Sequence, residues 1–68
     1  MNLRIETERE TDGRWLADVP DLPGTTCYGA NQAEAIAKVK TLALRVIADR
    51  LEHGEEIPAA AEMFSLAA

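Results

Sequence analysis

One long helical pattern constrains this chain more than any other feature. Ala, Leu, Lys and Arg predominate from Gln32 to His53. Asn31 is a good N-cap for this helix, and Glu34 follows three residues later, as in a capping box. Gly54 then ends the pattern as the glycine just past a helix. Because the helix takes up so much of a 68-residue chain, only a small sheet can accompany it.

The apolar side of the predicted helix is wider than one contact surface usually requires. Either a small sheet wraps this wide face, or one flank packs on the sheet and the other meets a second subunit. We favour the second arrangement, because the core of so short a chain rarely contributes more than roughly 3–5 kcal/mol of stability. The stripe comprises Ile36, Val39, Leu42, Ala43, Val46 and Ile47, and Leu44 and Leu51 widen it on one flank.

The residues before the helix predict three strands. Apolar and polar residues alternate from Leu3 to Glu8, and a second run extends from Arg14 to Val19. A turn at Thr11–Gly13 separates the two runs. Pro20 and Pro23 end the second strand, because each lacks the N–H that a ladder requires. Asp21–Gly24 forms the next turn, and Thr25–Tyr28 returns as a third strand.

The apolar pattern also selects the register of the first hairpin. A three-residue loop pairs Arg9 with Trp15 and Ile5 with Val19, which puts the apolar side chains of both strands on one face. A two-residue loop would put them on opposite faces. The longer loop needs a left-handed residue at its end, which Gly13 supplies. This register also predicts that the Arg9 guanidinium lies on the Trp15 ring.

The segment after the helix fits a short helix, a strand or a frayed end. Pro58 bars continuation of the helix. We predict a final strand, because Phe64 and Leu66 alternate with polar or small residues. The predicted fold is therefore a single α+β domain over residues 1–68, with a small antiparallel sheet and one long helix packed on one face.

No group of residues assembles a catalytic or metal site. Cys27 and His53 are the only nucleophile and base, and they lie on different predicted elements without a third group to orient the imidazole. One Cys and one His cannot form a four-ligand zinc site. We therefore expect a protein that is not an enzyme and has no cofactor. A residual nuclease dependent on Asp18 or Asp21 is a minor alternative.

The net charge of −5 argues against direct nucleic-acid binding, which relies on Lys and Arg to neutralise phosphates. The charge either keeps a small domain soluble or suits a basic partner. No apolar run approaches the ~20 residues of a membrane span, and the N-terminus has no apolar core of a signal peptide. We therefore expect a cytosolic protein that does not enter the membrane.

Two segments resemble the HicB antitoxin family. They are Trp-Leu-Ala-Asp-Val-Pro-Asp-Leu-Pro-Gly at 15–24 and Tyr-Gly-Ala-Asn-Gln-Ala-Glu-Ala at 28–35. The family pattern is an aromatic-rich strand, Val-Pro-Glu/Asp-Leu-Pro-Gly-Cys, a short strand, Gly-Asp-Thr, and a helix that opens with Glu-Ala. This chain departs from it at Thr25, in place of the Cys, and at 30–31, where Ala-Asn replaces Asp-Thr.

The resemblance implies a partial ribonuclease H-like fold, β-β-β-α-β, in which the last strand lies parallel to the first and beside it. It also implies a partner, a HicA-like mRNA-cleaving toxin whose active site the antitoxin covers. Only about fourteen residues follow Gly54, too few for the DNA-binding domain of longer family members, so self-repression is not expected. The alternative is an orphan structural or ligand-sensing oligomer of the same fold.

We expect the chain to bind a second copy of itself, as a homodimer or larger oligomer, in addition to the toxin. The candidate protein-interface residues are Trp15, Leu42, Leu44, Val46 and Phe64.

Overall fold

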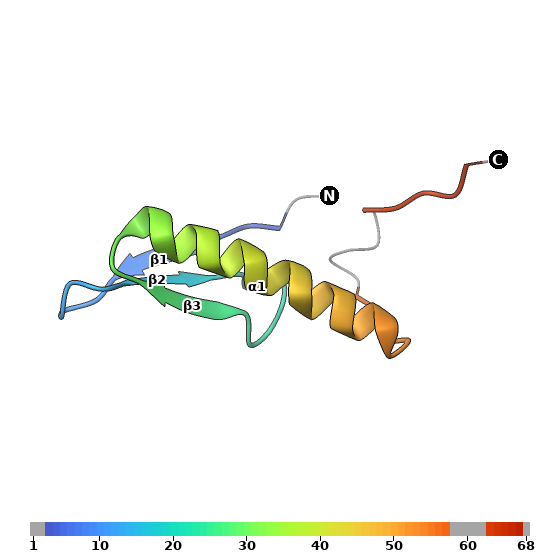
Figure 1. The fold of residues 1–68 in the computed structure, drawn as a ribbon, viewed down its shortest axis with the longest axis horizontal. Coiled ribbons are helices and arrows are strands. Elements are labelled where there is room, and N and C mark those ends of the chain that lie inside the picture. Colours follow the sequence, from blue (N-terminus) through green and yellow to red (C-terminus); the bar gives the residue numbers. More distant parts are fainter. Residues whose placement is uncertain (1–2, 58–62, 68) are drawn as a thin grey trace.

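The computed structural model describes residues 3–57 and 63–67. Three strands form an antiparallel sheet in the order β1-β2-β3, and one helix follows them. The sheet packs against the first part of the helix, which continues beyond it (Figure 1). The predicted α+β class is confirmed. The elements are β1 (Glu6–Arg9), β2 (Trp15–Asp18), β3 (Thr26–Gly29) and α1 (Gln32–Glu52).

The predicted register of the first hairpin is confirmed. Arg9 lies opposite Trp15, and Thr7 lies opposite Ala17. The Glu10 N–H donates to the Arg14 carbonyl at 2.7 Å, which closes a three-residue loop. Gly13 at the end of this loop has a φ of 90°. The strand is shorter than predicted, because the residues before Glu6 are outside the ladder.

The cation–π contact lies elsewhere than predicted. The Arg14 guanidinium, not that of Arg9, sits over an aromatic ring, 4.4 Å from the centroid of Tyr28. Arg14 Nε also donates to Asp12 Oδ2 at 2.8 Å, which holds the guanidinium in place. Alternation along a strand places Arg14 and Tyr28 on the face opposite Trp15. Arg9 faces the same side as Trp15 but is exposed.

The core lies between one face of the sheet and α1. On the helix, buried residues recur at every fourth position and form the centre of the predicted apolar stripe. Ile36, Leu42 and Val46 lie at the margins of this stripe and are half-buried. Leu22 is fully buried although it belongs to the turn between β2 and β3. The buried apolar residues are Ala17, Val19, Leu22, Ala35, Val39, Ala43, Ile47 and Ile57.

Thr25 places a hydroxyl in this core. Its side chain is 0% exposed, and its Oγ1 has no hydrogen-bond partner among the described residues. A buried hydroxyl without a partner costs about 1–3 kcal/mol.

We expect Thr25→Val to raise the free energy of unfolding by about 1 kcal/mol, because valine keeps the shape and removes the unpaired hydroxyl. Urea unfolding measures this difference. Thr26→Val is the matched control, since the Thr26 hydroxyl donates to Asp18 Oδ1 at 2.9 Å and should give no such gain. A Thr25→Val protein less stable than the wild type would contradict the interpretation of an unpaired hydroxyl.

The start of α1 is capped as predicted. Asn31 Oδ1 accepts a hydrogen bond from the Glu34 N–H at 2.8 Å. Glu34 Oε1 in turn accepts from the Ala30 N–H at 3.2 Å, one residue before the cap, and lies 3.2 Å from Lys38 Nζ. These bonds, first that from the Ala30 N–H and then that from Lys38, hold the pKa of Glu34 below its usual value of 4.5.

The lowered pKa predicts how stability changes with pH. A carboxyl with a lowered pKa stabilises the fold above its unfolded-state pKa, and this stabilisation is lost as the pH falls through the folded-state pKa. We therefore expect the melting temperature of the wild type to fall more between about pH 5 and about pH 3 than that of Glu34→Gln. Glu56→Gln, which removes the same charge elsewhere, should keep the wild-type slope. Equal slopes for Glu34→Gln and the wild type would refute this assignment.

The end of α1 is closed by a glycine in the left-handed conformation. Gly54 has a φ of 73°, and its N–H donates to the Leu51 carbonyl at 3.1 Å. The Glu55 N–H donates to the Arg50 carbonyl at 2.9 Å, which completes a Schellman motif. The predicted helix end is therefore correct to within one residue.

The helices of the described residues include none that is both long and apolar enough to cross a membrane.

The C-terminal segment differs from the prediction. Residues 63–67 form no strand, so a final strand over Phe64 and Leu66 is wrong for this part of the chain. Phe64 is 72% exposed and Leu66 is 99% exposed. Two alternating apolar residues are too weak a pattern to fix a strand without a partner strand. The remaining residues of the predicted segment, 58–62, lie outside the described residues.

Candidate interaction surfaces

The sheet has one covered face and one open face. Ala17 points toward α1 and is fully buried. Its neighbours along β2 point the other way, since side chains alternate along a strand. On this open face Leu16 pairs with Tyr28 of β3 and is half-buried, while Tyr28 is 44% exposed. An aliphatic and an aromatic side chain thus lie side by side at the centre of a solvent-facing sheet.

Carboxylates of β1 and β2 lie beside Leu16 in this apolar pair, whereas the Arg14 guanidinium lies over the Tyr28 ring on the same face. Glu8 lies opposite Leu16, and Glu6 lies directly opposite Asp18. Like charges directly opposite each other on neighbouring strands destabilise a sheet. Asp18 is partly compensated by the Thr26 hydroxyl, which donates to it at 2.9 Å. The acidic face is defined here as Glu6, Glu8, Leu16, Asp18 and Tyr28.

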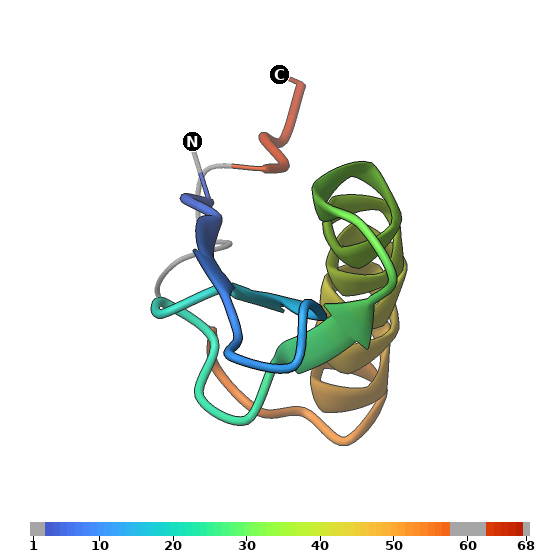
Figure 2. The same ribbon diagram turned by 90° about the vertical axis from the view of Figure 1, so that its left-hand side faces the viewer.

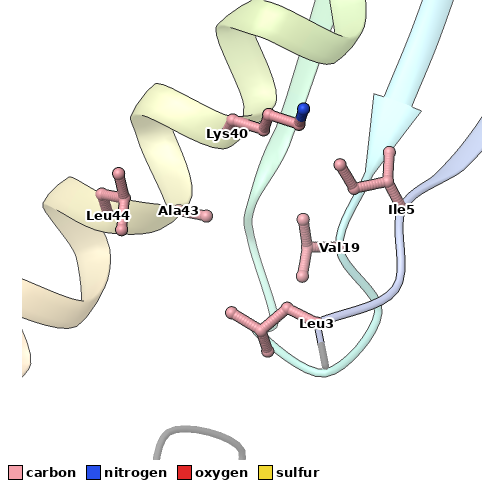
Figure 3. A pocket seen from close by; sticks show the side chains of 6 residues that line it. All are labelled: Leu3, Ile5, Val19, Lys40, Ala43 and Leu44. Atoms are coloured by element: carbon pink, nitrogen blue, oxygen red, sulfur yellow. The ribbon is translucent and has the colours of Figure 1, made fainter. Parts of the chain in front are cut away.

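A second surface lies between α1 and the chain that leads into β1. It is an apolar groove of about 250 Å³. The side chains of Leu3, Ile5 and Val19 face the helix across it, and Lys40 reaches over its rim (Figure 3). Leu44 is 60% exposed even though it lines the groove. The edge groove is lined by Leu3, Ile5, Val19, Lys40, Ala43 and Leu44.

The structure does not bring the five predicted interface residues together. Trp15 is half-buried and packs against the core. Leu44 lines the edge groove, whereas Leu42 lies on the other flank of α1, near Cys27. Val46 is half-buried and Phe64 is exposed. Of the five, Leu44 alone belongs to one of the two surfaces defined above.

Both surfaces contain residues that the sequence analysis passed over. The alternating sequence pattern identifies the core-facing side of the second strand, which holds Trp15 and Ala17. It does not identify Leu16 and Tyr28, which lie on the opposite face. Their signal is the cross-strand pairing, which places Leu16 opposite Tyr28 once the register is known. The sequence predicts Leu3 and Ile5 as core-facing residues of a first strand that begins at Leu3.

Cys27 and His53 are too far apart to act together. Cys27 is half-buried in β3 and lines a shallow hollow with Leu42. His53 follows the helix end, about 16 Å beyond Leu42 at ~1.5 Å per residue. Its Nδ1 lies 2.8 Å from the Asp49 carbonyl oxygen in the last turn of α1, so the imidazole is bound to the helix end. Among residues 3–57 and 63–67, no group of three His, Cys, Asp or Glu side chains is placed to hold a metal ion.

No protein-family model, curated protein or solved structure matches this chain. The likeness to the HicB antitoxins is therefore carried by the residues at 15–24 and 28–35 themselves.

Proposed function

We propose that this chain is an antitoxin-type protein-binding module that neutralises a HicA-like mRNA-cleaving toxin by covering its active site. The acidic face carries this proposal. Glu6 opposite Asp18 is a like-charge pair that weakens the free sheet, and a basic partner would relieve the repulsion. The chain binds and does not catalyse in this role.

The chemistry of the partner supports the same direction. A nuclease that cleaves mRNA must hold a phosphate backbone with basic side chains. A chain of net charge −5 is attracted to such a surface, which speeds encounter and helps to exclude acidic partners. Leu16 on the acidic face supplies an apolar anchor of the kind that protein interfaces usually require, and the Tyr28 ring beside it stays half exposed beneath the Arg14 guanidinium.

The fold is compatible with the family likeness in its first four elements. The meander β1-β2-β3 followed by α1 corresponds to the β-β-β-α part of a partial ribonuclease H-like fold. Residues 63–67 do not supply the last strand of that fold. We therefore propose the β-β-β-α part of that fold for residues 6–52 and a place of action in the cytoplasm.

Binding to a purified HicA-type nuclease tests this function, ideally the one encoded beside the gene for this chain. We expect the wild type to bind it and to stop mRNA cleavage. Glu8→Lys should weaken binding by about tenfold, more strongly at low salt, because it reverses a charge on the acidic face. Glu56→Lys makes the same charge change away from that face and should bind as the wild type does.

Two results would refute the proposal. One is a wild-type chain that neither binds nor inhibits the nuclease. The other is inhibition that Glu8→Lys and Tyr28→Ala leave unchanged while both variants fold normally, since the acidic face would then have no part in binding.

The edge groove favours a second candidate, an orphan oligomeric structural or ligand-sensing module without a toxin. Its volume of about 250 Å³ and apolar lining suit a small apolar group. A protein that forms a stable oligomer but fails to protect cells from any HicA-type nuclease would support this candidate over the first.

A further inference from the structure

The strand β1 has one free edge. Within residues 3–57 and 63–67 the sheet ends at β1, and β2 is its neighbour on the other side. Glu10 and Arg14 form a hydrogen-bonded pair at the hairpin. Because such pairs alternate along an antiparallel ladder, the backbone N–H and C=O groups of Thr7 and Arg9 point outward from the sheet. Ile5, one residue before β1, holds the next outward position of this alternation.

The two edges of the sheet differ in their protection. Figure 2 shows α1 on the β3 side of the molecule, while the chain that leads into β1 lies on the opposite side. Natural edge strands are usually protected by being short, by charged side chains, by proline, by a bulge or by an inward-pointing charge. β1 is four residues long, and its exposed side chains Glu6, Glu8 and Arg9 are all charged, so charge decides which partner this edge accepts. Residues Leu3 to Glu8 contain no proline, and the inward-facing side chains among them are Leu3, Ile5 and Thr7.

This edge is complementary to itself in one register. If two copies pair antiparallel with Ile5 opposite Ile5, then Arg4 of each copy lies opposite Glu6 of the other. Two opposite-charge pairs result, and both belong to closely spaced, non-hydrogen-bonded positions. Sliding one copy along the other by two residues puts Glu6 opposite Glu6, and sliding it by four residues puts Glu6 opposite Glu8. Both of these registers therefore bring carboxylates face to face. A shift by one residue exchanges the two faces of one strand.

We propose that this edge is the interface between two copies of the chain, which pair antiparallel about Ile5 to form one six-stranded sheet. The edge groove supports the assignment. Leu3 and Ile5 are only half-buried although they pack against the core, and Leu44 beside them is largely exposed. The second copy brings its own Leu3 and Ile5 to the same face, so that the two edge grooves meet and these side chains lose their contact with water.

The size of the domain gives an independent reason for such a partner. A chain of 68 residues buries a small core, and its single Cys excludes an intrachain disulfide. Association is the remaining common means of stabilising so small a scaffold. This pairing shares Glu6 with the acidic face but does not rest on the proposed toxin inhibition, because it is measured as the mass of the free chain without any nuclease.

Charge reversal tests the pairing. Sedimentation of the full chain over a range of concentrations should give twice the 7.4 kDa mass of one copy. Arg4→Glu and Glu6→Arg should each weaken the homodimer by about tenfold or more, because each replaces two attractive pairs by two repulsive ones. Both residues are exposed, so the fold should persist. Mixing the two variants should restore a dimer, since every facing pair is then attractive.

The double variant Arg4→Glu with Glu6→Arg fixes the register. It should dimerise as the wild type does if Ile5 lies opposite Ile5. In the register shifted by two residues, the carboxylate introduced at position 4 would face Glu8 of the other copy, and the double variant should remain monomeric. Glu52→Arg, a matched charge reversal at the far end of α1, should leave the mass unchanged.

Amide hydrogen exchange provides a second measurement. The Thr7 N–H, which points outward, should exchange more slowly as concentration rises, whereas the Glu8 N–H is bonded within the sheet and should not change. A wild type that stays monomeric at all concentrations would overturn the proposal. A dimer that resists both single charge reversals would also overturn it. If Phe64→Asp dissociated that dimer, the C-terminal segment would be the occupant of this edge.

Discussion

Gly29→Ala is expected to leave much of the protein unfolded at 25 °C. Gly29 ends β3 and lies directly beneath the first turn of α1. A methyl group at this position would lie 2.9 Å from the Ala35 Cα and 3.0 Å from the Asn31 carbonyl oxygen, and closer still to the Ala35 nitrogen. These are backbone atoms that no rotamer change can move, so the helix itself must shift away from the strand.

We expect a loss of about 3 kcal/mol or more, at the upper end for overpacking of a core. This approaches the whole stability that a domain of this size usually has. Circular dichroism and thermal melting measure the effect. Gly13→Ala is the matched control, because a methyl group there meets nothing within 4 Å and only the positive φ is unfavourable. It should cost about 1 kcal/mol. Equal effects of the two substitutions would show that the helix is not held against Gly29.

Leu22→Ala should have the second largest effect. Leu22 is 0% exposed although it lies in the turn between β2 and β3. Its N–H donates to the Val19 carbonyl at 2.9 Å, and its carbonyl accepts from the Thr25 N–H at 3.1 Å, so the backbone cannot move to fill a cavity. We expect a loss of about 3 kcal/mol in the free energy of unfolding, within the range for Leu→Ala in cores.

Leu66→Ala is the matched control for this second prediction, because Leu66 is 99% exposed. It should change stability by less than about 0.5 kcal/mol. Urea unfolding at constant protein concentration compares the two variants, since association would add to the stability of both. A Leu22→Ala protein as stable as Leu66→Ala would mean that the turn is not part of the core.

Local rules were sufficient for most of the fold. The period-two pattern and Gly13 together gave the register of the first hairpin, because a slip of one residue would have exposed the apolar face. Asn31 and Gly54 gave the bounds of the helix, since caps are short-range signals that the sequence contains directly. These features require no knowledge of contacts between distant residues.

The features that remained hidden depend on such contacts. Thr25 is typical of a strand, and its unpaired hydroxyl follows only from the complete burial of its side chain in the folded chain. The position of Arg14 over Tyr28 requires the pairing of β2 with β3. For the same reason the exposed side of the sheet and the edge groove, which are the candidate sites, were not identified before the structure.

Ile57 gives the end of α1 a mechanical role. It is only 6% exposed and belongs to the core, three residues after the glycine that closes the helix. Arg50 near the same end donates to the Pro23 carbonyl at 3.4 Å. Tension applied to the C-terminus, for example by a fused partner, would therefore act on a buried side chain before it could unwind the helix. A domain attached behind residue 68 would pull on the folded core itself.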